Sequence, residues 1–560
     1  MLSFENFVVD FVGTFVESSR CPLPSALRPP SPGPIFSNCT RPANLSRQSQ
    51  AKEEAQRRRK SKIVVAQPTI YLDLRPAFSQ VFRCSTVIYN ALVLSLVLVC
   101  SALIAGCKRF EPKTLSPKES AASFENRSLD DPGLKEFAEE FTRPAPDSWP
   151  PAQWDFPALT VVAFYYHPAL DLARAQWNVA KASIKTAGGR PNPILTVAPG
   201  YSMNPASGLS PWFPLASLDL PVETAGKRGY RISHAQKLSE AARLNIASAA
   251  WQVRSNLRLA LLDYSAAQQR ADLLQMQLQI QQQMVTLLEQ RLQAGAATRN
   301  ELTLPRLAQA RLGVDFADAT RLAAEARVRI ADALGLPAKA IADAKLPTAP
   351  PVSVEAGKEL TTDEARQQAL LGRPDVLAAL AEYGAIESLL QLEIARQFPD
   401  IHLNPGYQFD QGEHKWSLGL SAELPVLNQN QGPIAETRAK RQESAARFVE
   451  LQAKVIADID RALAARAAAL DQVTRQGQLT QLASEQSAAA EAMFNAGASD
   501  KLELSSAQLE ASASNLAYLD AQIRAQQAVA QLEDAIQRPL QPWPALERGR
   551  SAKVGESLNR

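Results

Sequence analysis

The chain carries one sequence unit twice, and this duplication restricts the folds that it can adopt. The tripeptide Pro-Gly-Tyr occurs at residues 199–201 and again at residues 405–407, an offset of 206 (405 − 199). The same offset relates two further pairs of prolines: Pro193 with Pro399, and Pro168 with Pro374. Internal similarity at a constant spacing predicts two copies of one architecture.

Two later matches extend the alignment along the chain. A Trp followed by Leu-Pro-Val recurs in residues 212–222 and 416–426 at an offset of 204, and the loop before it is therefore two residues shorter in the second copy. Ala-Gly-Ala recurs at residues 294–296 and 496–498 at an offset of 202. Although 560 residues would allow several ordinary domains, a duplicated unit predicts a single elongated body.

Each copy begins with a predicted β-hairpin. In the second copy, polar residues alternate with four apolar ones: Ile401, Leu403, Tyr407 and Phe409. A period of two is typical of a strand with one apolar and one polar face. The full set of predicted strands is 193–203, 212–222, 399–409 and 416–425.

Aromatic residues stand near the turn of each predicted hairpin. They are Tyr201 and Trp212 in the first copy, and Tyr407 and Trp416 in the second. Tilted strands of about ten residues can cross a bilayer, and aromatic side chains gather at its two interfaces. We therefore expect these four residues to form an aromatic girdle, although a soluble β-sandwich would show the same alternation.

Each hairpin precedes a segment with the composition of one long helix. Residues 230–294 contain neither Gly nor Pro and predict a helix of 65 residues, roughly 100 Å long at about 1.5 Å per residue. Residues 434–496 repeat this pattern, interrupted only by Gly477. Leu273, Ile280 and Leu287 recur every seven residues, which predicts a coiled-coil seam.

Both long helices are predicted to end at the Ala-Gly-Ala motifs, with Gly295 and Gly497 in the turns. A return helix then extends to about Leu334 in the first copy and Gln537 in the second. Pro305 falls near the start of the first return helix, where proline is tolerated. We expect Gly295 and Gly497 to form the tips farthest from the strands.

Four strands are too few to close a membrane barrel. An open sheet edge in lipid leaves unpaired backbone groups, each costing several kcal/mol. Because the smallest outer-membrane barrels have about 8 strands, at least two chains are needed, and three chains would give twelve strands with an open lumen. The strands therefore predict an oligomer.

All five cysteines lie in the first part of the chain, and Cys107 is the last of them. A long apolar run precedes it, with Arg83 before the run and small residues at its end, which is typical of an export signal. The stretch resembles a bacterial lipoprotein signal, in which residues 104–106 are the recognition box and Cys107 is the lipidated residue. A transmembrane anchor is the alternative.

Several functional classes lack the residues that they need. A net charge of +3 without a clustered basic face argues against nucleic-acid binding. The four histidines and the cysteines show no zinc-type spacing, although His402 and His414 could approach each other across the second hairpin. With no phosphate-binding glycine loop and no nucleophile motif, we expect no enzyme activity, no metal site and no cofactor.

The order of hairpin, long helix, glycine turn and return helix, written twice, resembles the outer-membrane efflux protein family. "RPDVLAAL" at Arg373 and "LPVLNQNQG" at Leu424 add to this resemblance, which covers residues 149–540. It implies an α+β membrane protein whose homotrimer forms a twelve-stranded β-barrel and a periplasmic α-helical barrel. The implied partners are a periplasmic adaptor, an inner-membrane transporter and outer-membrane lipid. "NQNQG" at residues 428–432 is similar to a form found in the heavy-metal branch.

The resemblance also implies a gate at the periplasmic tips, closed by acidic residues just after the second turn. The matching residue is Glu503, whose copies in a trimer would form a ring of carboxylates that favours cations. Glu301 is its counterpart in the first copy. Both glutamates could instead be solvated first-turn residues that favour the helix dipole by under about 1 kcal/mol.

Two other classes of protein remain as alternatives to the exit duct. A lipid-anchored periplasmic adaptor would have one helical hairpin with soluble β-domains on either side, and a rod-like scaffold would need no alternating strands. The expected domain order is a disordered leader or mis-assigned start (1–82), a signal peptide (83–106), a linker (107–148), repeat 1 (149–340), a linker (341–360), repeat 2 (361–540) and a disordered tail (541–560).

Overall fold

The computed structural model describes residues 110–141, 149–347 and 360–541. Among the described residues, those before Lys118 belong to one unit of the chain and those from Lys118 onward to a second unit. The predicted signal peptide and Cys107 lie outside the described residues. The account below concerns the described part of the second unit.

The two sequence copies fold into the same order of elements. The first copy contains α5 (Phe156–Tyr166), α6 (Pro168–Ala187), β1 (Ile194–Ala198), β2 (Leu215–Val222), α7 (Lys227–Gln293) and α8 (Arg299–Leu334). The second contains α9 (Thr362–Gly372), α10 (Pro374–Ala395), β3 (Ile401–Asp410), β4 (Glu413–Ala422), α11 (Gln431–Asn495) and α12 (Lys501–Ile536). Helices α3 (Pro117–Glu125) and α4 (Pro132–Phe141) precede the first copy, and η1 (Ala338–Ile341) follows it.

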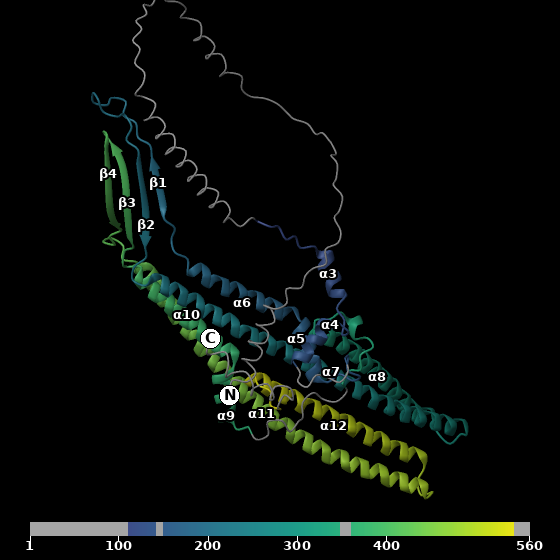
Figure 1. Ribbon diagram of the computed structural model, residues 1–560. Helices are drawn as coiled ribbons and strands as arrows, with labels where there is room; N and C mark the ends of the chain where they lie inside the picture. Colours follow the sequence, from purple (N-terminus) through teal and green to yellow (C-terminus); the bar gives the residue numbers. More distant parts are fainter. Residues whose placement is uncertain (1–109, 142–148, 348–359, 542–560) are drawn as a thin grey trace, which may run out of the picture. The chain divides into compact units, whose positions relative to one another are not determined.

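The strands form one antiparallel sheet in the order β1-β2-β3-β4 (Figure 1). Strands β2 and β3 join the two copies, so β1 and β4 are the edges. The predicted first hairpin was too long, because regular pairing stops at Ala198 and Leu215 and continues only as a bridge between Tyr201 and Trp212. Prolines interrupt this stretch, and a proline has no N–H to donate to a ladder.

The second hairpin is regular and closes over two residues. Gln411 and Gly412 both have positive φ, 53° and 90°, as a tight hairpin turn requires. This turn lets β4 begin at Glu413, three residues before the predicted start at Trp416. The predicted alternation over β3 is confirmed.

The predicted long helices are confirmed. Helix α7 has 67 residues and α11 has 65, and each packs along its return helix, α8 or α12 (Figure 1). At about 1.5 Å per residue each is roughly 100 Å long. Gly477 lies inside α11 and does not interrupt the helix, and a Cβ there would make an ordinary van der Waals contact of 3.4 Å with the Tyr518 ring.

The predicted coiled-coil seam on α7 was displaced by one residue. The structure buries Leu274 and Leu288 against α8, with Gln281 between them, whereas Leu273 and Leu287 are only half-buried. Leucines stand next to each other at 273–274 and at 287–288, so periodicity alone could not choose between the two registers. Among the described helices, none is both long enough and apolar enough to cross a membrane.

The main core joins the segment before the first copy to α5, α6, α7 and α8. Arg127 donates to the carbonyl oxygens of Tyr166 and Gly335, both at 2.8 Å, and ties α5 to the end of α8. Gly335 has φ 72°, and a Cβ there would lie 2.8 Å from the backbone of His167. Only glycine fits this left-handed helix cap.

Candidate functional site

The sheet separates apolar from polar side chains onto its two faces. Directly paired residues point to the same face, so the registers define both sets. The apolar face contains Leu195, Val197, Ala216, Leu218, Leu220, Ile401, Leu403, Tyr407, Phe409, Trp416, Leu418 and Leu420. The opposite face, which we call the polar face, contains Thr196, Ser217, Asp219, His402, Asn404, Gln408, Ser417 and Ser421. The registers also place four apolar residues there, namely Ile194, Ala198, Leu215 and Pro221.

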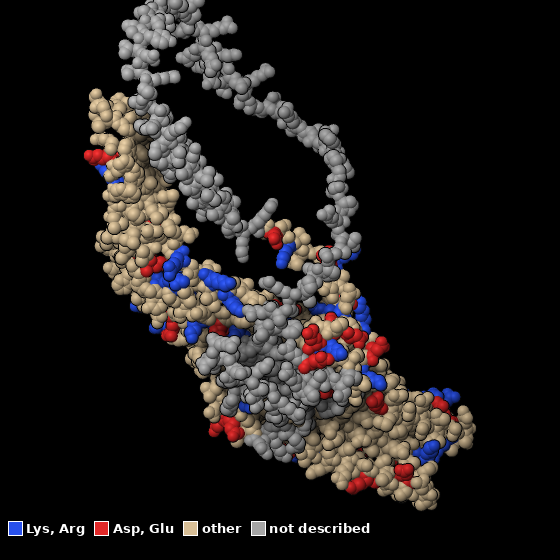
Figure 2. All heavy atoms as spheres, in the orientation of Figure 1, with Lys and Arg blue, Asp and Glu red and all other residues tan. Residues whose placement is uncertain are grey.

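The apolar face is uncovered in the single chain. The side chains of Trp416, Leu418 and Leu420 are 80%, 73% and 70% exposed. Figure 2 shows charged side chains at the two ends of the sheet and a band without them in between, on the face in view. An exposed apolar surface of this kind marks a contact with lipid or another protein.

The four predicted girdle residues form two aromatic pairs, one on each hairpin. The ring centroids of Tyr201 and Trp212 lie 5.0 Å apart, and those of Tyr407 and Trp416 lie 4.8 Å apart. Both distances are in the range of favourable aromatic pairs. The duplicated sequence therefore builds the same cross-strand contact twice.

The two aromatic pairs are staggered along the sheet. Tyr407 pairs with Ala216, which pairs with Val197, so Tyr201 lies four residues (201 − 197) beyond the level of Tyr407. Four residues span about 13 Å along a strand, whereas the two strand spacings from β1 to β3 span about 10 Å across the sheet. A register stagger of this kind is what the tilted strands of a closed barrel need.

The glycines of the two Pro-Gly-Tyr motifs make room for the residue across the hairpin. A Cβ on Gly200 would lie 2.2 Å from the Phe213 ring, and a Cβ on Gly406 would lie 2.8 Å from the Ser417 hydroxyl. The neighbouring Tyr makes the aromatic pair described above. Close approach and aromatic pairing together explain why the tripeptide is written twice.

An ion pair and a polar hollow lie where the strands meet the helices. The buried Lys227, at the start of α7, donates to Asp400 at 2.8 Å and to the Phe398 carbonyl at 2.7 Å. Beside it is a hollow of about 300 Å³, with Arg396 and Glu423 among its lining residues. These contacts fix β3 of the second copy to α7 of the first.

The two predicted tip turns have nearly identical geometry. Gly295 and Gly497 are left-handed, with φ 74° and 73°. One residue later, Ala296 donates to the Arg291 carbonyl and Ala498 to the Met493 carbonyl, both at 2.8 Å. The turns close α7 and α11 at the ends opposite the strands, as predicted.

The glutamates after the two turns have different surroundings. The Glu301 carboxylate accepts a hydrogen bond of 2.8 Å from the Thr298 hydroxyl. Glu503 is exposed, and within the described ranges no side chain pairs with its carboxylate. Its backbone N–H instead donates to Asp500, whose other carboxylate oxygen accepts from Arg291 at 2.9 Å. The Glu503 carboxylate is therefore free to face a ligand or a neighbouring copy.

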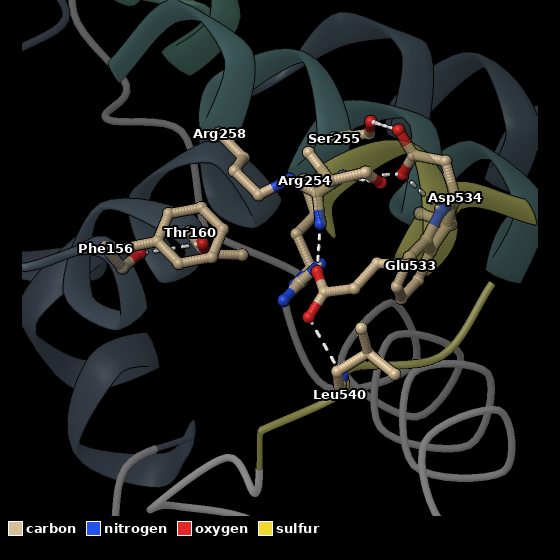
Figure 3. A network of polar contacts seen from close by, with 10 residues as sticks. Phe156, Thr160, Arg254, Ser255, Arg258, Glu533, Asp534 and Leu540 are labelled. Carbon is tan, nitrogen blue, oxygen red and sulfur yellow. Dashed lines mark hydrogen bonds and ion pairs between the residues drawn. The ribbon is translucent and has the colours of Figure 1, made fainter. Parts of the chain in front are cut away.

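A buried charge cluster joins the middle of α7 to the last turn of α12 (Figure 3). Arg258 and Glu533, each 1% exposed, form an ion pair, and Arg254 donates to the same carboxylate at 3.2 Å. Arg258 also donates to Asp534 at 2.8 Å. The cluster satisfies several charges at once, as buried ions require.

Helix α5 and the segment that follows α12 both contact this cluster (Figure 3). The Arg254 guanidinium lies 5.1 Å from the centre of the Phe156 ring, and the Leu540 N–H donates to Glu533 at 2.9 Å. No sequence pattern singled out these residues. Arg254 and Arg258 are four positions apart in an apolar part of α7, so the sequence places both on one face of the helix. It does not identify the residues that this face contacts.

The histidines of the second hairpin do not come together. His402 lies on the polar face and bonds Asp219 at 2.9 Å, whereas His414 lies at the turn and bonds the Tyr407 hydroxyl at 2.7 Å. The hairpin register separates them by pairing His402 with Ser421. No group of three or more His, Cys, Asp or Glu side chains among the described residues is placed to hold a metal ion.

Comparison with known sequences places the chain in a family. The sequence profile described as outer membrane efflux protein matches residues 163–336 and 365–537, more than half of the chain. The chain belongs to the outer membrane efflux protein family. The two matched ranges correspond to the two structural copies, and the resemblance seen in the sequence is confirmed. Members of this family are transport channels.

A curated relative and two solved structures illustrate the similarity. The chain is 25% identical over 221 residues to the cobalt-zinc-cadmium resistance protein CzcC of Cupriavidus metallidurans, covering 39% of this chain and 51% of the relative. It thus spans about half the length of that relative. The outer membrane protein VceC of Vibrio cholerae superimposes with a TM-score of 0.57 at 19% identity, over 70% of this chain and 100% of VceC. The open-state outer membrane channel MtrE of Neisseria gonorrhoeae superimposes with a TM-score of 0.55 at 16% identity, over 70% of this chain and 90% of MtrE. These structural likenesses show the fold.

Proposed function

We propose that this member of the outer membrane efflux protein family is a passive exit duct that works as a homotrimer. Three sheets would close a twelve-stranded barrel in the outer membrane, and the helices would form a tunnel through the periplasm. The observation that carries the proposal is the four-stranded sheet with an apolar face, a polar face and two open edges. Lipid would cover the apolar face, and the polar face would line a hydrated lumen.

The stagger between the two hairpins supports closure of such a barrel. Equivalent residues of the two hairpins are displaced by four residues along the strands (201 − 197). Such a displacement is expected in a closed barrel, because its strands must tilt relative to the barrel axis. Pairing β4 of one chain with β1 of the next chain would satisfy the backbone hydrogen-bonding groups of both edges. Lipid could not do so.

We further propose that a periplasmic adaptor and an inner-membrane transporter deliver the cargo. The tips at Gly295 and Gly497 would meet the adaptor, and Cys107 would carry lipid in the outer membrane. The described residues offer no recognisable catalytic site, so the energy for transport would come from the transporter. The similarity to a protein named for cobalt, zinc and cadmium resistance supports metal ions as the first cargo to test.

The proposal is tested by membrane fractionation, mass measurement and single-channel recording of the purified protein. We expect recovery with outer membranes, the mass of three chains in detergent, and a stable conductance in planar bilayers. A lipid-anchored adaptor or scaffold would instead be extracted without conductance. A monomer that remains soluble after signal cleavage would refute the duct.

The cargo is tested separately by growth. A strain that lacks the gene should become sensitive to cobalt, zinc or cadmium if metal ions are exported, and to dyes or detergents if organic molecules are. The matched control is the same strain carrying the gene on a plasmid. Unchanged growth in all three metals would exclude these ions as the cargo.

A further inference from the structure

Basic side chains gather at the end of α6, where this helix meets the sheet. Lys185 lies in the last turn of α6, and Arg190 follows the helix cap at Gly188. Arg228 lies in the first turn of α7, and its Nε donates to the Gly188 carbonyl oxygen at 2.8 Å. We call Lys185, Arg190 and Arg228 the basic patch.

No carboxylate neutralises the basic patch. All three residues are exposed, and no Asp or Glu in the described part of the chain forms an ion pair with any of them. Residues 172–218 contain neither Asp nor Glu. The neighbouring Arg231 differs, because it forms an ion pair with Glu223. The basic patch therefore presents unpaired positive charge.

The end of the helix does not by itself account for the basic patch. The free carbonyl groups at a helix C-terminus attract cations, which is the ordinary reason for basic residues there. Arg228 and Arg231 already donate to the carbonyl oxygens of residues 187–189. Lys185 and Arg190 are therefore in excess of what this helix end needs.

The second copy has no equivalent of the basic patch. The offsets of 206 and 204 place three residues at its positions: Gln391 for Lys185, Arg396 for Arg190, and Gly432 for Arg228. The basic one, Arg396, forms an ion pair with Glu393 at 2.6 Å. Ala187 stands where Glu393 does, so the first copy has no such partner for its arginine. The charge is thus specific to one copy of the repeated unit.

The basic patch lies at the edge of the uncharged band on the sheet. Figure 2 shows Lys and Arg side chains gathered at the base of the sheet and over α6, next to the band without charged side chains. The apolar face begins on β1 at Leu195, five residues (195 − 190) after Arg190. Five residues of extended chain span at most about 17 Å. The basic patch is therefore within reach of the boundary of the proposed membrane.

Helix α6 keeps its basic side separate from its exposed apolar side. Leu172 and Val179, 60% and 72% exposed, are seven residues apart and lie on one side of the helix. At about 3.6 residues per turn, Lys185 lies about 120° around the helix from Val179. Contact of the apolar side with another chain would therefore leave Lys185 accessible.

We propose that the basic patch binds the phosphate groups of anionic phospholipids in the periplasmic leaflet of the outer membrane. The proposal rests on the duct proposed above, because the sheet must cross that membrane for its base to meet the headgroups. Ammonium and guanidinium groups donate to phosphate oxygens, and a guanidinium does so through two parallel hydrogen bonds. Because one copy carries the patch, each chain would bind lipid beneath its first hairpin.

Native mass spectrometry of the full-length protein in a neutral detergent tests the site with added phosphatidylglycerol. Each Lys or Arg near an anionic membrane surface raises affinity roughly fivefold. The variant Lys185→Gln with Arg190→Gln retains Arg228 and its contact with α6, and should bind this lipid about tenfold more weakly or less. Phosphatidylcholine, which has a phosphate but no net charge, should bind wild type and variant equally. Equal affinity of both proteins for phosphatidylglycerol would overturn the proposal.

Arg299→Gln with Lys501→Gln is the matched control. It removes the same charge from two exposed residues at the tips of the helical hairpins, far from the sheet, and should keep the wild-type affinity. The trimer mass of each variant shows that it is folded. A loss of binding in the control as large as that in the patch variant would assign the effect to net charge and overturn the site.

Two other ligands give distinct results. Displacement of the lipid by an equal concentration of inorganic phosphate would indicate a site for free phosphate and overturn the lipid assignment. Binding to purified peptidoglycan that is lost in the patch variant, with lipid binding unchanged, would make the cell wall the partner and also overturn it. Wild-type trimers that bind no phosphatidylglycerol would refute this inference alone, whereas a wild-type monomer in the membrane would refute the duct.

Discussion

At the scale of single residues, equivalent positions in the two copies of the unit make different contacts. Glu301 and Glu503 occupy matching first turns, yet a threonine holds one carboxylate and the other is free. Arg291 and Met493 occupy matching last turns, and only Arg291 forms an ion pair. Single substitutions after duplication thus separate a contact within the chain from a surface that faces outward.

Replacing Glu503 with Gln tests the proposed gate. A ring of three carboxylates attracts cations, so we expect the variant to have lower cation selectivity and weaker block by divalent cations, with unchanged assembly. Single-channel recording of the purified trimer measures both. Glu301→Gln is the matched control and should behave as wild type. Identical selectivity and block for wild type and Glu503→Gln would remove this residue from the gate.

Replacing Glu533 with Gln tests the buried cluster. The substitution keeps the shape of the side chain but removes one of the two carboxylates that Arg258, 1% exposed, contacts, and the more deeply buried of the two. Breaking one side of a buried ion pair costs roughly 3–5 kcal/mol. We expect a loss of this size in the free energy of unfolding from denaturant titration. Asp318→Asn, which breaks an exposed pair with Arg321, is the control and should have little effect; equal losses would contradict the burial argument.

At the scale of elements, the hairpins and helices divide the tasks of the proposed duct. The sheet presents one apolar and one polar face, whereas the helices bury small and branched side chains against each other. Charged contacts join the copies at both ends of α7 and along its length. The boundary between the sheet and the helices therefore coincides with the proposed change of surroundings from lipid to water.

The two faces of β4 should respond differently to the same charge. Leu418 lies on the apolar face, where an arginine at the centre of a bilayer costs about 2–4 kcal/mol. Leu418→Arg should reduce the amount of assembled protein in outer membranes, as measured by quantitative blotting of unheated samples. Ser417→Arg, on the polar face, is the control and should assemble. Equal assembly of both variants would argue against a lipid-facing surface.

Acid should loosen the contact between the tips of the two helical hairpins. The backbone N–H of Glu503 and, after it, Arg291 hold the pKa of Asp500 below its usual value of 3.8. A carboxylate with a depressed pKa contributes stability above its usual value, and the contribution disappears as the pH falls through the lower folded value. Spin labels at Arg299→Cys and Lys501→Cys should therefore report a longer distance at low pH. Asp500→Asn should remove this pH dependence, and a response unchanged in that variant would assign it elsewhere.

At the scale of the whole molecule, a single chain completes the contacts between its two copies but leaves its sheet open. The ion pairs between the copies already form within one chain, so each chain can order its two copies before it meets another. The edges β1 and β4 and the apolar face remain open. Assembly of the proposed trimer would then satisfy the open edges.

Replacing Cys107 with Ser tests the proposed lipid anchor. The variant should lose labelling with radioactive palmitate but still form trimers, because the proposed barrel would hold the protein in the membrane independently of the acyl chains. Native gels of outer-membrane extracts measure the trimer. Each of the four earlier cysteines replaced singly with Ser serves as a control and should keep the label. Palmitate labelling that persists in Cys107→Ser would refute the assignment.

The sequence by itself determined the duplication, the alternation over β3, the long helices and the left-handed turns at Gly295 and Gly497. These features are local or periodic, so they depend only on neighbouring residues. Tertiary structure alone decided that Leu274 rather than Leu273 lies in the seam, and that His402 meets Asp219. It also brought Arg254 and Glu533 together across 279 residues of chain. Such pairs depend on the register in which distant elements pack, and the pattern of a single element does not contain that register.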